Sequence, residues 1–174
     1  MASHRTKPLR LSLIASALAV ASLAVAQSMI PAPDRDFAEK AAMGGTAEVQ
    51  SGRMAERKGM NSQVKQFGAR MAQDHAKAGD ELKRIAAGKG LTLPQGPSPE
   101  DKREMDKLDK LAGDDFDRAY MSHMVADHKK DIAAFEKEAS SGQDPDIKAF
   151  AAKTLPTLRE HLKLAMSAEQ AARK

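Results

Sequence analysis

Three histidines and one glutamate have the residue types and the spacing to form a metal site inside a helical protein. His75, His128 and His161 each interrupt a stripe of apolar residues that recurs every three or four positions, the spacing of one helix face. Glu48 lies on a predicted face made mostly of small residues, which lets a neighbouring helix approach closely around the carboxylate. Buried polar groups without partners cost ~1–3 kcal/mol each, so these four side chains need one another, water or a metal ion.

The set of possible ligands indicates which metals would fit. Three imidazoles and a carboxylate suit a first-row transition metal such as copper, zinc or iron. Met71, Met121 and Met124 lie on the histidine-bearing faces of their segments, and thioether sulfur favours Cu(I), which shifts the expectation toward copper. Oxidative di-iron chemistry is disfavoured, because such bundles carry Glu-x-x-His on two helices and no acid stands three residues before any of these histidines.

Two segments repeat the pattern M-x-x-D-H, at residues 71–75 and 124–128. Each aspartate lies about 100° around the helix from its histidine. Asp74 and Asp127 can therefore accept hydrogen bonds from histidines on neighbouring helices, and Tyr120 is a third candidate partner. A purely structural interpretation also fits, in which these polar neighbours satisfy the histidines and methionine fills gaps in the core. The sequence leaves both interpretations open.

The sequence does not indicate any other kind of catalytic or binding site. The chain has no cysteine, which excludes disulfides, thiol catalysis and cysteine-ligated zinc. The nucleophile-elbow, P-loop and H-E-x-x-H motifs are absent from the sequence. No residue is a candidate for catalysis or for binding an organic cofactor, so enzymatic activity is not indicated.

Helix start and stop signals predict the elements that must position these side chains. Long helices are expected at residues 37–58, 62–87, 114–140 and 144–170, and a short one begins at Ser98-Pro99 and ends near Gly113. Asp36 is the expected N-cap of the first helix, with Glu39 completing a capping box. The sequence therefore predicts an all-α, ferritin-like four-helix bundle over residues 36–170, with a short extra helix in the connection between the second and third long helices.

The predicted bundle brings the candidate residues to one height. Glu48, His75, His128 and His161 each lie near the middle of a long helix. Mid-helix residues of similar-length helices share one layer whether neighbouring helices run parallel or antiparallel, so the four should converge in the core. Two details of the bundle are less constrained. Pro156 should kink the last helix, and the long connection can either cross the whole bundle or fold back.

The N-terminus has the pattern of an export signal. Residues 4–10 are basic, residues 11–26 are uncharged and apolar, and Ala24-Val25-Ala26 forms an A-x-A cleavage site before Gln27. The apolar run is shorter than the ~20 residues needed to span a bilayer, although an uncleaved anchor is the alternative. The expected organisation is a signal peptide at residues 1–26 and a flexible leader at residues 27–35. The mature protein is then expected in the periplasm or cell envelope, with no transmembrane span.

Charge argues against nucleic acid as a partner. The formal net charge is +4, and three of the basic residues, Arg5, Lys7 and Arg10, belong to the predicted signal. Without that segment, basic and acidic side chains are nearly equal in number. A nearly neutral protein lacks the cationic excess that phosphate binding requires.

Several short motifs together resemble a known family. They are Ala42-Met43-Gly44-Gly45 followed by Glu48, residues 71–75, Phe116-Asp117 followed by Tyr120, His128, and Leu155-Pro156 followed by His161. In these positions the chain, over about residues 37–166, resembles the exported bacterial proteins grouped as domain of unknown function 4142. The resemblance implies a ferritin-like bundle in the periplasm or outer envelope and implies no particular activity.

Two functional hypotheses follow from the sequence. The first is a metal-binding protein that uses Glu48, His75, His128 and His161. The second is a non-catalytic envelope or stress-response protein, whose surface binds an envelope protein or a second copy of the chain and whose core histidines are structural.

Overall fold

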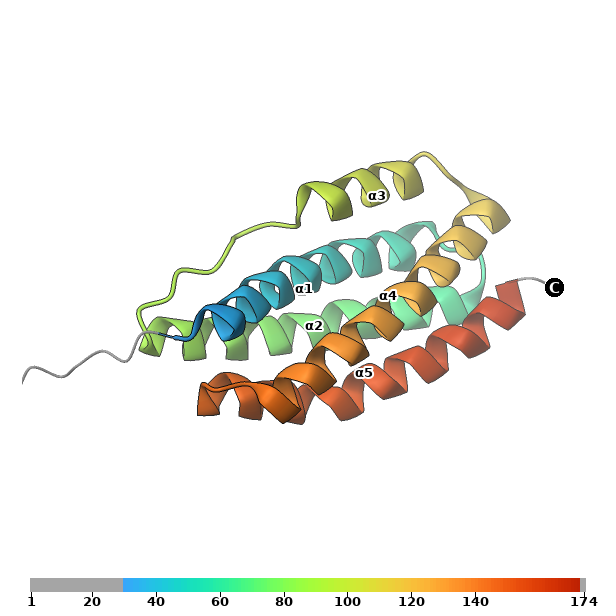
Figure 1. Cartoon of the computed structure of the whole chain (residues 1–174). Helices are drawn as coiled ribbons and strands as arrows, with labels where there is room; N and C mark the ends of the chain where they lie inside the picture. Colours follow the sequence, from blue (N-terminus) through green and yellow to red (C-terminus); the bar gives the residue numbers. More distant parts are fainter. Residues whose placement is uncertain (1–29, 173–174) are drawn as a thin grey trace, which may run out of the picture.

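The computed structural model describes residues 30–172 as five helices (Figure 1). The helices are α1 (Ala32–Lys58), α2 (Ser62–Gly88), α3 (Pro99–Asp109), α4 (Gly113–Ser141) and α5 (Pro145–Ala172). The predicted all-α bundle of four long helices and one short helix is confirmed. Residues 1–29, which contain the predicted export signal, lie outside the described part of the chain.

Capping residues explain why several helices begin where they do. The Asn61 side chain accepts a hydrogen bond of 2.8 Å from the backbone of Gln63 at the start of α2. Ser98 and Asp101 form a reciprocal capping box at the start of α3. The α5 helix remains helical on both sides of Pro156.

The start of α1 differs from the prediction. The helix begins at Ala32 rather than near Phe37, so Asp36 lies inside it and is not an N-cap, and residues 32–35 belong to the helix rather than to a flexible leader. Pro33 stands in the first helical turn, where the missing backbone N–H has no helical acceptor to lose. Asp34 is buried and binds the α4–α5 turn, which holds this first turn on the bundle.

The helices form two antiparallel hairpins, α1–α2 and α4–α5, which pack against each other through α2 with α5 and α1 with α4 (Figure 1). The α2 helix ends at one end of the bundle and α4 begins at the other. The connection that contains α3 therefore crosses the length of the bundle, with α3 lying against α1 and α4. No helix within residues 30–172 is long and apolar enough to cross a membrane.

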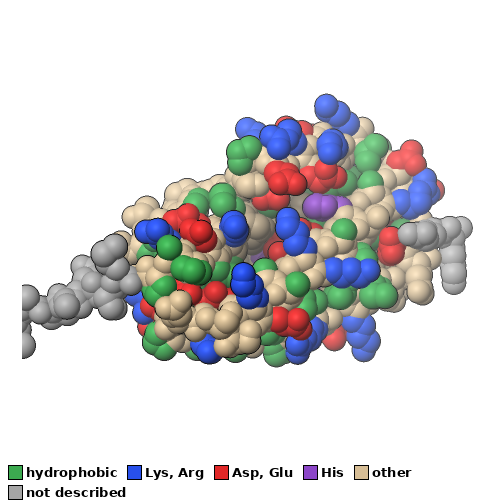
Figure 2. Space-filling model, viewed as in Figure 1, with side chains coloured by type: hydrophobic (Ala, Val, Ile, Leu, Met, Phe, Trp, Pro, Cys, Tyr) green, Lys and Arg blue, Asp and Glu red, His purple; other side chains and the backbone are tan. Residues whose placement is uncertain are grey.

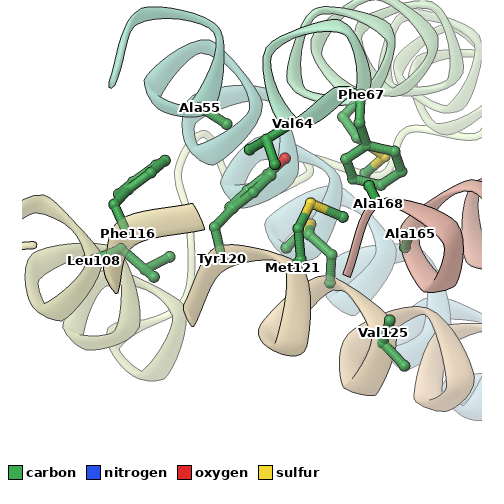
Figure 3. Close-up of a cluster of buried hydrophobic side chains, with 12 residues drawn as sticks. Ala55, Val64, Phe67, Leu108, Phe116, Tyr120, Met121, Val125, Ala165 and Ala168 are labelled. Atoms are coloured by element: carbon green, nitrogen blue, oxygen red, sulfur yellow. The ribbon is translucent and has the colours of Figure 1, made fainter. Parts of the chain in front are cut away.

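Two apolar clusters fill the core. One gathers Phe67, Tyr120 and the predicted copper-favouring methionines Met71, Met121 and Met124 with their neighbours (Figure 3). The other is formed by residues such as Leu82, Phe135, Ile147, Phe150 and Leu158. Along α2, α4 and α5 the three histidines fall between residues of the first cluster and residues of the second. The polar layer thus divides the core into two apolar halves.

A close contact between two glycines sets the distance between α1 and α2. A Cβ atom added at Gly68 would lie 2.6 Å from the Gly52 carbonyl oxygen and 2.8 Å from the Ala55 Cβ, and one added at Gly52 would lie equally close to the Gly68 carbonyl. Glu48 lies one turn before Gly52 on α1, and His75 lies two turns after Gly68 on α2. The absence of side chains at the crossing therefore lets these two polar residues meet.

We expect Gly68→Ala to destabilise the protein by about 1–3 kcal/mol, because the new methyl group forces two helix backbones apart. The midpoint of urea unfolding at constant slope measures the loss. Gly44→Ala is the matched control on α1, since a Cβ there has no neighbour within 4 Å. An unchanged midpoint for Gly68→Ala would show that the helices separate without cost.

Candidate metal centre

Each long helix contributes one polar side chain to the middle of the bundle. Glu48 comes from α1, His75 from α2, His128 from α4 and His161 from α5, and all four are buried. The imidazole centroids lie 5.8 Å apart for His75 and His128, 5.3 Å for His75 and His161, and 5.5 Å for His128 and His161. The three histidines expected to converge therefore form one compact group.

One nitrogen of each ring has a polar partner that is not another histidine. His75 Nδ1 lies 2.8 Å from Glu48 Oε2, His128 Nδ1 donates to the Met124 carbonyl oxygen at 2.9 Å, and His161 Nε2 lies 3.0 Å from Asp74 Oδ2. A backbone carbonyl or an ionised carboxylate only accepts, so His128 Nδ1 and His161 Nε2 carry the protons of their neutral rings. The three contacts orient all three imidazoles, and the last two also fix the tautomers of His128 and His161.

The other nitrogen of each ring has no hydrogen-bond partner among the described residues. These atoms are His75 Nε2, His128 Nε2 and His161 Nδ1, and each is buried. One ring nitrogen from each histidine can be chosen so that all three lie within 4.8 Å of one another. Each of the three clustered histidines thus has a buried ring nitrogen that is free to bind a metal ion.

Burial keeps these rings neutral. It lowers the pKa of His75 to about 4 and that of His128 to about 3, and the neighbouring imidazoles lower the pKa of His128 further. Burial also lowers the pKa of His161, although the hydrogen bond to Asp74 opposes this shift. A neutral imidazole is the form that binds a metal, so the three ligands are ready at neutral pH.

Asp74 links the centre to the surface. Its Oδ2 faces His161 and also accepts from Arg70 Nε at 3.2 Å. Burial raises the pKa of Asp74, but the hydrogen bonds from His161 and Arg70 outweigh burial and leave that pKa below its usual value. An ionised Asp74 is a strong acceptor, which raises the basicity of His161 as a ligand.

Glu48 adjoins two further carboxylates. One oxygen of each of Glu48, Asp127 and Asp131 can be chosen so that all three lie within 4.8 Å of one another. Burial and mutual repulsion raise the pKa of Asp131 to about 8, and burial raises the pKa values of Glu48 and Asp127. Asp131 was not identified from the sequence, although it lies one helical turn after His128.

The remaining predicted partners lie elsewhere. Asp127 adjoins Glu48 and Asp131, and the acceptor for His128 is the backbone carbonyl of Met124. The Tyr120 hydroxyl is buried without a hydrogen-bond partner in the described structure, and burial raises its pKa. Glu48 Oε1 also lacks a partner and lies 3.6 Å from His128 Nε2.

Comparison with known proteins places the chain in a family. The sequence model of the family described as domain of unknown function (DUF4142) matches residues 19–168. The chain belongs to the DUF4142 family. The resemblance found in the sequence motifs is thereby confirmed, and the buried centre described above lies within the matched region.

A solved structure shares the fold of this DUF4142 protein. It is described as the crystal structure of a DUF305 fragment from Deinococcus radiodurans, and it superposes with a TM-score of 0.72 at 12% sequence identity. The match covers 82% of this chain and 98% of that chain. A search of curated proteins gave no match. At this identity the likeness to DUF305 extends to the helical fold alone.

Proposed function

We propose that this DUF4142 protein binds one first-row transition-metal ion through His75, His128 and His161. The observation that carries the proposal is one compact group of three buried histidines, each with a ring nitrogen that has no hydrogen-bond partner among the described residues, in which one nitrogen from each ring can be chosen so that all three lie within 4.8 Å of one another. The other nitrogen of each ring has a polar partner, which is how protein metal sites fix imidazole ligands.

The energetics favour a cation over an empty polar layer. A buried acceptor without a partner costs about 1–3 kcal/mol, and this centre holds three such nitrogens. Metal–nitrogen bonds are ~2 Å long, so three ligand nitrogens around one ion lie up to ~4 Å apart. One ring nitrogen from each histidine can be chosen so that all three lie within 4.8 Å of one another. Only small movements of the rings are therefore needed to bring three nitrogens around one ion.

The donor set favours copper or zinc over hard cations. Neutral imidazoles suit both ions, and copper(II) binds a given nitrogen site more tightly than zinc(II). Glu48 positions His75 through Oε2, and its Oε1 can accept a hydrogen bond from a ligand in the fourth coordination position. Met71, Met121 and Met124 pack in the adjoining apolar cluster, where flexible thioethers fill irregular space.

Metal analysis of the protein tests the proposal. The mature chain is purified without a histidine tag, analysed for bound metals, stripped, and titrated calorimetrically with copper(II) and with zinc(II). One equivalent of each ion is expected to bind, with copper displacing zinc. The absence of stoichiometric binding of both ions would leave the histidines with a structural role.

We also propose that the chain is exported and cleaved before Gln27, on the basis of the basic start, the short apolar run and the A-x-A site. Intact-mass analysis of the protein recovered from the cell envelope is expected to give a chain that begins at Gln27. A mass that retains residues 1–26 would indicate a membrane anchor instead.

Figure 2 shows acidic and basic side chains interspersed over the visible face, without a large area of one sign. Such a surface gives no electrostatic reason to assign a polyanion as the partner. The proposed activity therefore centres on the bundle interior.

A further inference from the structure

The two helical hairpins repeat the same contacts at one constant separation along the chain. Asp34 on α1 accepts hydrogen bonds from the backbone of the α4–α5 turn at residues 143–144. Asp117 on α4 accepts them from the backbone of the α1–α2 turn at residues 60–61, with Asn61 N at 2.7 Å. The separation from Asp34 to Asp117 along the chain equals the separation between the two turns, so each hairpin holds the other in the same way.

The same separation along the chain relates other residues that have similar roles in the two hairpins. It relates Asn61 to Asp144, which precede α2 and α5 and each accept from the backbone of the following turn. It also relates Phe67 to Phe150, one in each apolar cluster. Glu48 is related to Asp131, and both belong to the carboxylate group at the centre.

The three histidines break this relation. The same separation takes His75 to Leu158, while His128 and His161 correspond to Gly45 and Ala78. One half of the centre therefore carries three imidazoles, and the related half carries two small residues and a leucine. Replacing a ring by hydrogen or methyl leaves space unless neighbouring residues fill it.

A cavity of about 30 Å³ lies in this second half of the centre. Its lining includes all three counterparts, Gly45, Ala78 and Leu158, and also Glu48, His75 and Asp131. A cavity measured with a water-sized probe needs roughly 10–15 Å³ to hold one water molecule. The space therefore suits a molecule of two or three atoms beside the histidine group.

A surface cleft leads toward the cavity. The cleft has a volume of about 170 Å³ and lies along α1 and α2, with Pro94 of the following connection in its wall. Gly45, His75 and Gly79 line both the cleft and the cavity. A Cβ atom at either glycine would have no neighbour within 4 Å, so open space rather than packed side chains lies at these positions.

We propose that this cavity binds a diatomic or triatomic molecule that occupies the fourth coordination position of the metal and enters between Gly45 and Gly79. The inference rests on the proposed metal site. Three protein nitrogens leave a tetrahedral ion one position open. His75 borders both the metal group and the cavity, and Glu48 also lines the cavity.

Azide, a triatomic ligand, tests the proposal on the mature chain loaded with one equivalent of cobalt(II). Cobalt affinity is measured first for each variant, and azide binding is then followed by visible absorption. Gly45→Val should weaken azide binding by at least about tenfold, and Gly45→Ala should weaken it less. Gly44→Val and Gly44→Ala are matched controls on the same helix, where a Cβ also has no neighbour within 4 Å, and they should bind azide as the wild type does.

A second probe tests the size limit. Imidazole coordinates cobalt but is larger than the cavity, so it should bind far more weakly than azide. Unchanged azide affinity in a cobalt-loaded Gly45→Val protein, or imidazole binding as tight as that of azide, would overturn this inference and leave the metal site standing. A wild-type chain that binds none of copper(II), zinc(II) and cobalt(II) would overturn the proposed metal site, and the ligand pocket with it.

Discussion

Replacing His128 with alanine is expected to abolish tight metal binding. His128 is fully buried, its Nδ1 is fixed by the Met124 carbonyl, and its Nε2 is one of the three unpartnered nitrogens. Alanine leaves two imidazoles and a cavity, so affinity should fall by about a thousandfold or more, equivalent to about 4 kcal/mol. Calorimetric titration with zinc(II) measures the loss.

Thermal unfolding gives an independent measure of the same effect. A ligand that binds only the folded state raises the melting temperature by mass action. Zinc should therefore raise the melting temperature of the wild-type chain and leave that of His128→Ala unchanged. His123→Ala is the control from the same helix, since His123 is only partly buried and does not belong to the three-histidine group. Equal zinc-dependent shifts for wild type and His128→Ala would contradict the assignment.

The helices could be predicted because their ends carry strong local signals. Asn61, the Ser98–Asp101 box and the glycines between elements act within a few residues of each boundary. The start of α1 was misjudged because Pro31 and Pro33 also fit an extended leader. A tertiary contact favours the helix there, because Asp34 accepts a hydrogen bond from the α4–α5 turn, more than a hundred residues further along the chain.

The histidines of the candidate metal centre could also be predicted from local features of the sequence. A histidine inside an apolar stripe is conspicuous, and a mid-helix position fixes its height in a bundle of equal helices. The partners of the rings were harder to predict. Asp74 could be proposed because its position around the helix points it toward a neighbouring helix. The acceptor for His128 is a backbone carbonyl, and because every residue has one, the sequence does not single it out. In the sequence, Asp131 resembles an ordinary surface acid. Only the packing of the α1 helix places Glu48 beside it.

The pH dependence of zinc affinity is expected to follow the carboxyl groups rather than the imidazoles. Protons compete for His75 and His128 only below their pKa values of about 4 and 3. Asp131, with a pKa of about 8, is mostly protonated at neutral pH without a metal, and burial also raises the pKa of Glu48. A nearby cation favours their ionised forms, so binding releases protons and affinity rises with pH.

We therefore expect zinc affinity to increase between about pH 5 and pH 8, by up to about tenfold per pH unit for each proton released. Titrations in buffers of different ionisation enthalpy count those protons. A loss of binding centred near pH 6.5 would instead indicate solvated histidines with ordinary pKa values.

Asp131→Asn separates the carboxyl contribution from the rest of the centre. At pH 5 the wild-type Asp131 is already neutral, so the variant should bind zinc nearly as tightly as the wild type. At pH 8, near the pKa of Asp131, the wild-type carboxylate attracts the ion and the amide does not, so the variant should bind about tenfold more weakly and release up to about half a proton fewer. Asp115→Asn, at an exposed ion pair with Arg118 on the same helix, should leave both the affinity and the proton count unchanged. Equal weakening of the Asp131 variant at both pH values would show that Asp131 acts through packing rather than through its charge.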